Sequence, residues 1–212
     1  MDSHTSAAFE LRQKYKYFRI LVIGRANAGK TTLLKRVCNT TEEPCIYDEE
    51  KNLLEPTGDR GTHDIHRSFA FASNPGFIFH DSPGFETGDV NQLKEVQQFI
   101  ADHARATDVK DQIHAIWFCL VTNGSRPLLE LEKKFFDEKQ PGNVPVIVIF
   151  TKFDDLVNQI YDPDMEEEQN CEAAMDYLLE KFKKPLLQCR FPPKAHLVLK
   201  GMKLGLSMVE DI

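Results

Sequence analysis

The residues with the clearest chemistry form a short stretch bounded by glycines near the N-terminus. Gly24, Gly29, Lys30 and Thr31 stand at the spacing G-x-x-x-x-G-K-S/T. Glycines let the backbone curl so that successive N–H groups face an anion, while the lysine reaches the β- and γ-phosphates of a nucleotide and the hydroxyl binds Mg²⁺. The stretch predicts a phosphate-binding loop (a P-loop), in which further contacts come from Asn27, Ala28 and Thr32. A glycine turn that merely matches the pattern is the alternative.

A second motif follows the apolar run Val144–Phe150 and bears on which base is bound. Residues 151–154 read Thr-Lys-Phe-Asp and fit the pattern N/T-K-x-D. The carboxylate of Asp154 can accept hydrogen bonds from both the ring N–H and the exocyclic amine of guanine, a donor pair that adenine lacks. The aliphatic stem of Lys152 can lie along the base. We therefore expect Thr151, Lys152 and Asp154 to recognise guanine.

A third motif, D-x-x-G, begins at Asp81, directly after the apolar run Phe77–His80. The carboxylate of Asp81 would hold Mg²⁺ through water, and the N–H of Gly84 would contact the γ-phosphate. A simple Pro-Gly turn would give the same letters. Three such motifs in this order, each after a predicted strand, favour a Mg²⁺-dependent guanine nucleotide site.

The elements that must position these motifs alternate between strand and helix patterns. Strands are predicted at Tyr17–Ile23, Asp64–Phe71, Phe77–His80, Ile113–Val121, Val144–Phe150 and Ala195–Leu199. Helices are predicted at Lys30–Cys38, Asn91–Ala104, Leu128–Phe136 and Glu166–Phe182. Residues 39–63 are predicted as loop, with a turn at 74–76. The pattern predicts an α/β fold: a mostly parallel six-stranded sheet with one antiparallel edge strand and helices on both faces.

Composition limits the classes of function. The 212 residues carry a net charge of −7, which argues against nucleic acid or an anionic membrane as the main ligand. Five cysteines without a C-x-x-C pair favour free thiols in a reducing compartment. The polar N-terminus lacks the apolar run of a signal peptide, so we expect a cytoplasmic protein. One domain over residues 15–212 is expected after a flexible arm at 1–14.

The three motifs together resemble the G domain of P-loop GTPases of the translation-factor-like class. Gly24–Leu33 (GRANAGKTTL) is similar to the loop of TrmE and Era-like proteins. Two segments, Asp81–Glu86 (DSPGFE) and Thr151–Asp154, resemble uncharacterised fungal G-domain proteins and, more distantly, septin and immunity-associated GTPases. The resemblance covers about residues 15–200. It implies a three-layer P-loop NTPase fold, GTP or GDP as ligand and Mg²⁺ as cofactor.

The resemblance also implies two further metal contacts. A threonine in the loop before Asp64 would bind Mg²⁺; Thr62, 19 residues before Asp81, is preferred over Thr57. In some TrmE and Era-like proteins an asparagine at the position of Asn27 helps to bind K⁺, which replaces an arginine finger. The alternative is that Asn27 merely suits a turn.

Two departures from the family pattern bear on activity and extent. Ras-like enzymes place a water-orienting glutamine after D-x-x-G, whereas this chain has Phe85. Glu86 and His80 are nearby, but His80 fits a packed strand residue better, and no general base is assigned. After Leu199 only residues 200–212 follow, without an S-A-K sequence and without room for a full closing helix. Two alternatives are left: a degenerate guanine-contacting loop near Gly201, or a truncated chain.

The expected function is that of a GTP-hydrolysing molecular switch with a low intrinsic rate, in which Lys30 and Thr62 carry the catalysis. The alternatives are a GTP-binding interaction module with little or no hydrolysis, and an ATPase. The partners expected are an effector protein, which the sequence does not identify, and a second copy of the chain in a nucleotide-dependent homodimer.

Overall fold

The computed structural model describes residues 17–47, 53–54, 64–82, 90–124 and 127–199. The predicted arm at 1–14 and the residues after Leu199 lie outside these ranges, so the predicted domain limits stay predictions. Among the described residues the strands form one eight-stranded sheet in the order β3-β2-β4-β5-β1-β6-β7-β8.

Five parallel strands form the centre of the sheet and one of its edges. They are β5 (Asn74–Asp81), β1 (Phe18–Gly24), β6 (Ala115–Val121), β7 (Val146–Thr151) and β8 (Ala195–Val198). The three remaining strands pair antiparallel: β4 (Ser68–Phe71), β2 (Cys45–Tyr47) and β3 (Leu53–Leu54). The predicted class of fold is confirmed.

The extent of the antiparallel part differs from the prediction. The sheet has eight strands instead of six, because β2 and β3 lie within 39–63, which was predicted to be loop. Strands of three and two residues are too short for a hydrophobic period of two to reveal them. The turn predicted at 74–76 is also wrong, because these residues begin β5 and Asn74 pairs with Phe71.

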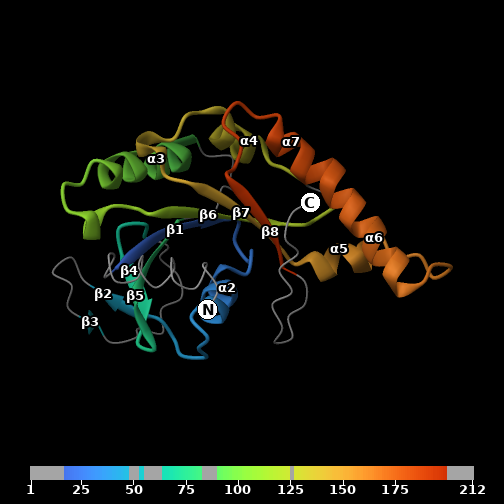
Figure 1. Ribbon diagram of the computed structural model, residues 1–212, viewed down its shortest axis with the longest axis horizontal. Helices are drawn as coiled ribbons and strands as arrows, with labels where there is room; N and C mark the ends of the chain where they lie inside the picture. Colours follow the sequence, from blue (N-terminus) through green and yellow to red (C-terminus); the bar gives the residue numbers. More distant parts are fainter. Residues whose placement is uncertain (1–16, 48–52, 55–63, 83–89, 125–126, 200–212) are drawn as a thin grey trace, which may run out of the picture.

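Helices cover both faces of the sheet, as predicted. Figure 1 shows α2 (Lys30–Val37) alone on one side and the remaining helices together on the other. These are α3 (Val90–Ala104), α4 (Glu130–Asp137), α5 (Phe153–Gln159), α6 (Glu167–Leu178) and α7 (Lys184–Leu187), with α6 joined to α7 by a π-helical turn at Leu179–Lys183. None of the helices in the described ranges is long and apolar enough to cross a bilayer.

Alternate side chains of the central strands pack into two separate cores. In β1, Leu21 and Ile23 join the core under α3–α7, while Ile20 and Val22 join the core under α2. Burial on both faces explains why these strands are continuous apolar runs. Because the central strands are parallel, their carboxyl ends lie together at one edge of the sheet. This edge runs across the strand ends and is distinct from the outer strands β3 and β8. It carries the three predicted motifs.

Candidate functional site

The three motifs converge where the chain order of the sheet reverses. β1 lies between β5 and β6, and Val22 of β1 is in register with Asp81 of β5. The N–H of Ser82 donates to the carbonyl of Val22 at 3.0 Å. β7, which ends at Thr151, is separated from β1 by β6 alone, so the two ends are about 10 Å apart. In open α/β sheets such a switch point is where ligands bind.

Two glycines of the P-loop are needed for different reasons. A Cβ on Gly24 would come within 2.7 Å of the carbonyl oxygen of Cys119, so glycine lets β1 pack closely on β6. Gly29 has φ 76°, a left-handed conformation, at the N-cap of α2.

Two other residues at the loop are Cys119 and Asn27. Burial raises the pKa of the Cys119 thiol to about 12, which keeps this neighbour of the loop neutral. Asn27 is exposed with φ 58°, which an asparagine tolerates well.

Lys30 begins α2 and its side chain folds back over the loop. The side chain is 7% exposed, and Nζ donates to the carbonyls of Gly24 at 2.9 Å and Arg25 at 3.3 Å. Its distance to Oδ1 of Asp81 is 3.5 Å, so the P-loop lysine and the D-x-x-G carboxylate are brought together. The ammonium is thereby placed within the curve of the loop, beside the N-terminus of α2. Both features favour an anion.

The residues predicted to hold Mg²⁺ supply suitable donors. Thr31 is exposed in the first turn of α2, and Asp81 ends β5 with its side chain 21% exposed. Hydroxyl and carboxylate oxygens are the ligands that Mg²⁺ prefers, so these two residues fit the ion. Thr32 is exposed beside Thr31. Other predicted contacts lie outside the described residues and stay predictions: Thr57, Thr62, Gly84, Phe85, Glu86 and Gly201.

The predicted guanine-binding residues follow β7 in a tightly held turn. Lys152 has φ 57° and is the N-cap of α5, which places Asp154 in the first turn of that helix with its side chain exposed. The hydroxyl of Thr122 lies 3.0 Å from the carbonyl of Thr151 and 2.9 Å from that of Lys152, and donates to this pair. Neither Thr122 nor α5 was predicted from the sequence, because α5 is short and begins inside the motif.

A buried ion pair joins the P-loop to α4 and was not predicted from the sequence. Arg25 is an unspecified position of the motif, yet its guanidinium forms two hydrogen bonds with Glu132 of α4, Nε to Oε1 at 2.8 Å and Nη2 to Oε2 at 2.7 Å. Arg25 is 8% exposed and Glu132 is 1% exposed. The only sequence signal was an acidic residue three positions after the helix N-cap.

His80 is not suited to act as a base. Nη1 of Arg19 donates to Nε2 of His80 at 2.7 Å, so the Nδ1–H must donate to the carbonyl of Ile65 at 2.8 Å. Burial, then the Arg19 charge, lowers the pKa of His80 to about 3. The imidazole is therefore a neutral packed group, and it alternates along β5 with Asp81, so that it points to the opposite face of the sheet.

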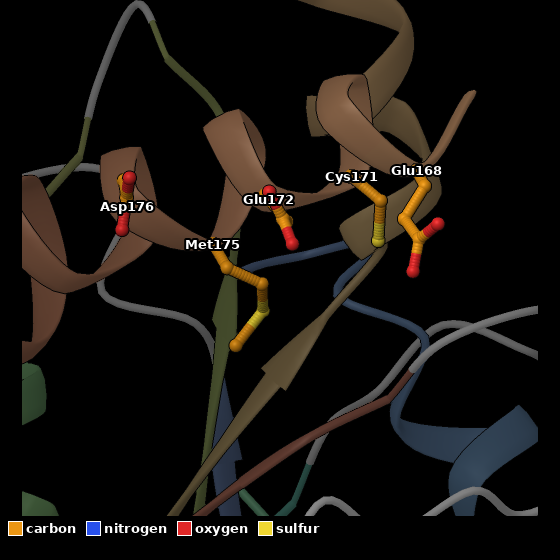
Figure 2. A pocket seen from close by; sticks show the side chains of 5 residues that line it. All are labelled: Glu168, Cys171, Glu172, Met175 and Asp176. Atoms are coloured by element: carbon orange, nitrogen blue, oxygen red, sulfur yellow. The ribbon is translucent and has the colours of Figure 1, made fainter. Parts of the chain in front are cut away.

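A hollow beside α6 is a poor candidate for a nucleotide site. Figure 2 shows that its described lining comes from this helix alone: Glu168, Cys171, Glu172, Met175 and Asp176. Three of the five side chains are carboxylates, which repel phosphates. Because of this acidic lining, the carboxyl ends of β1, β5 and β7 are a better candidate for phosphate binding than the hollow.

Comparisons with known proteins agree with this geometry. Residues 19–152 match the family model described as 50S ribosome-binding GTPase. The match begins in β1, contains the whole P-loop and ends inside the 151–154 motif.

Two bacterial relatives match at low identity. GTPase Era of Nitrosomonas eutropha is 27% identical over 146 residues, which cover 69% of this chain and 43% of that protein. The probable GTP-binding protein EngB of Paraburkholderia phymatum is 25% identical over 138 residues, 64% of this chain and 57% of that protein. The chain thus spans about half the length of the relatives it matches.

Proposed function

Because the chain belongs to the family of 50S ribosome-binding GTPases, we propose that it binds GTP and GDP with Mg²⁺ and hydrolyses GTP slowly, as a molecular switch. The observation that carries the proposal is the meeting of three segments at one sheet edge. Lys30 lies 3.5 Å from Asp81, and the turn at Thr151–Asp154 lies on the same edge, two strands from Gly24.

The phosphate-binding residues and the guanine-binding residues at this edge have separate roles in the proposal. The backbone N–H groups of the P-loop, the N-terminus of α2 and Lys30 neutralise the phosphates. Asp154 accepts the two donors of guanine and rejects adenine, which would leave its carboxylate unpaired. Mg²⁺, when bound by Thr31 and Asp81, would offset the negative charge that develops on the β- and γ-phosphates.

Low intrinsic hydrolysis follows from the groups near the phosphates. Lys30 and Thr62 stabilise charge in the proposed reaction, and water attacks the γ-phosphate in line. His80 stays neutral and faces away from Asp81, so it does not take the proton from that water. The resemblance to TrmE and Era-like proteins adds K⁺ binding by Asn27 to the proposal; a plain turn, which suits its left-handed backbone, is the alternative.

Chromatographic identification of the nucleotide in the purified protein tests the binding half of the proposal. We expect GDP or GTP, and we expect the Lys30→Ala variant to purify without nucleotide. Recovery of ADP or ATP instead would support the ATPase alternative and contradict the role of Asp154.

Single-turnover hydrolysis of GTP, measured in K⁺ and again in Na⁺, tests the catalytic half. The proposal expects hydrolysis faster than that of GTP in buffer, and faster in K⁺ than in Na⁺. A rate equal to buffer would leave a GTP-binding interaction module as the function. Equal rates in the two salts would reject the K⁺ role of Asn27 while leaving GTPase activity intact.

A further inference from the structure

Arg25 ties the P-loop to a helix that is distant in the sequence. Besides its two hydrogen bonds with Glu132, its Nη2 donates to the carbonyl of Pro127 at 3.4 Å. Oε2 of Glu132 also accepts the N–H of Leu129, at 2.8 Å, at the N-cap of α4. The guanidinium therefore connects the start of the P-loop to the segment that leads into α4.

The backbone of Arg25 connects to the phosphate-binding groups themselves. Its carbonyl accepts from the N–H of Ala28 at 3.1 Å and from Nζ of Lys30 at 3.3 Å. One residue thus holds α4 with its side chain and holds the loop and its lysine with its main chain.

The loop between Arg25 and Lys30 requires such support. Asn27 and Gly29 both have positive φ, and residue types that tolerate this conformation do not by themselves fix it. The far end of the loop is fixed by α2, into which it leads. The near end follows β1, which pairs with β6 as far as Gly24. The Arg25–Glu132 pair is a side-chain anchor at the first residue after this paired strand.

We propose that Arg25 is a positioning residue for nucleotide phosphates, held by its ion pair with Glu132 so that the P-loop N–H groups and Lys30 are set before the ligand arrives. This inference rests on the proposed nucleotide site and goes beyond it, because the residue is unspecified in the motif and its partner is 107 residues away. Preorganisation lowers the entropy lost on binding, so the pair should strengthen binding of nucleoside diphosphates.

The rival interpretation is that the pair only stabilises the fold. The two interpretations differ because a buried ion pair replaced on both sides by apolar groups of similar volume often leaves stability unchanged. The double variant Arg25→Met/Glu132→Leu therefore removes the anchor while keeping the packing. The Arg25→Lys variant keeps a charge but loses the two-pronged geometry. Leu186→Ala, a buried change in α7, is the control for destabilisation at a distance.

The test measures GDP affinity and thermal unfolding for the wild type and the three variants. We expect the double variant to unfold near the wild-type temperature and to bind GDP about tenfold more weakly or worse. Arg25→Lys should weaken binding by a smaller factor, and it serves as the deciding variant if the double variant does not fold. Leu186→Ala should unfold earlier with unchanged GDP affinity.

Hydrogen exchange gives a readout that a purely structural role would not change. Coupling between two sites is reciprocal, so GDP should protect the N–H of Leu129 in the wild type. That protection should be lost in Arg25→Lys, which keeps Glu132 as the acceptor of the Leu129 N–H.

Three outcomes are distinguishable. Weaker GDP binding at unchanged stability, together with lost protection of Leu129, supports the inference. Wild-type affinity in folded Arg25 variants overturns it while leaving the proposed function standing. A wild-type protein that binds no GDP overturns the proposed function, and the inference fails with it.

Discussion

The phosphate end of the proposed site (Arg25, Lys30 and Asp81) and its guanine end (Thr122 and Thr151–Asp154) share one sheet edge but are held by different forces. At the phosphate end the contacts are charged: Lys30 lies beside Asp81, and Arg25 is paired with buried Glu132. At the guanine end Thr122 and Thr151 form neutral hydrogen bonds from their hydroxyls to main-chain carbonyls. Substitutions that remove a charge should therefore weaken binding most at the phosphate end. At the guanine end, substitutions that change hydrogen-bond geometry should weaken it most.

The largest expected effect is the loss of the P-loop lysine. Lys30→Ala should weaken GDP binding about a hundredfold or more, because each charge-assisted hydrogen bond to phosphate is strong. Lys35→Ala is the matched control on the same helix, since Lys35 pairs with Glu43 at the surface, at 2.7 Å. Titration calorimetry should show wild-type affinity for Lys35→Ala. Equal losses in the two variants would contradict the distinction.

At the guanine end, Asp154→Ala should weaken GDP binding by about tens of fold while leaving ADP binding unchanged, because only guanine offers Asp154 two donors. Asp155→Ala, an equally exposed acid in the same turn of α5, is the control. Competition of ADP with a fluorescent GDP measures both affinities. A parallel drop for GDP and ADP in Asp154→Ala would mean that the residue acts through overall charge instead of base recognition.

Acid should destabilise the fold through His80, which lies beside Asp81 in β5 but faces away from the phosphate end. Its pKa is about 3 in the folded protein and about 6.5 when unfolded, so the unfolded state binds the proton first as the pH falls. The stability that neutral His80 contributes is fully present above pH 6.5. As the pH falls toward 3, the free energy of unfolding decreases by about 1.4 kcal/mol per pH unit at most.

His80→Gln removes this titration. Urea unfolding at pH 7 and pH 5 should show a difference smaller by about 2 kcal/mol in the variant than in the wild type. The same pH dependence in both proteins would contradict the assignment of the shift to His80.

The smallest expected effect is at the hydroxyl that supports the guanine end. Thr122→Val removes the donor to Thr151 and Lys152 and should lower the free energy of unfolding by about 1 kcal/mol, with a loss in GDP affinity of a few fold. Thr122→Ser keeps the hydroxyl and should stay near the wild type in both measurements. Wild-type affinity in Thr122→Val together with weaker GDP binding in Thr122→Ser would mean that the methyl group and not the hydrogen bond is what matters.

The motifs could be predicted because their chemistry is local. A lysine, a hydroxyl and glycines at fixed spacing, each set following an apolar strand, indicate phosphate and base sites without knowledge of tertiary contacts. The alternation of strands and helices predicted the parallel centre of the sheet for the same reason. Burial on both faces makes runs such as Val146–Phe150 continuous and apolar.

What could not be predicted depends on pairing at a distance. β2 and β3 are defined by main-chain hydrogen bonds to neighbouring strands and not by side-chain pattern. The Arg25–Glu132 pair joins residues 107 positions apart. Within the motif, Gly24 was assigned to curling of the loop, whereas its closest neighbour is the carbonyl of Cys119 in the adjacent strand.

The central claim, that one edge of the sheet binds guanine nucleotides through charge at one end and base recognition at the other, is tested most directly by calorimetric titration of the wild-type protein. GDP and ADP are compared in Mg²⁺. We predict tight binding of GDP and binding of ADP weaker by about tens of fold or more, because adenine offers Asp154 no donor pair. Equal affinities for the two nucleotides, or a preference for ADP, would contradict it.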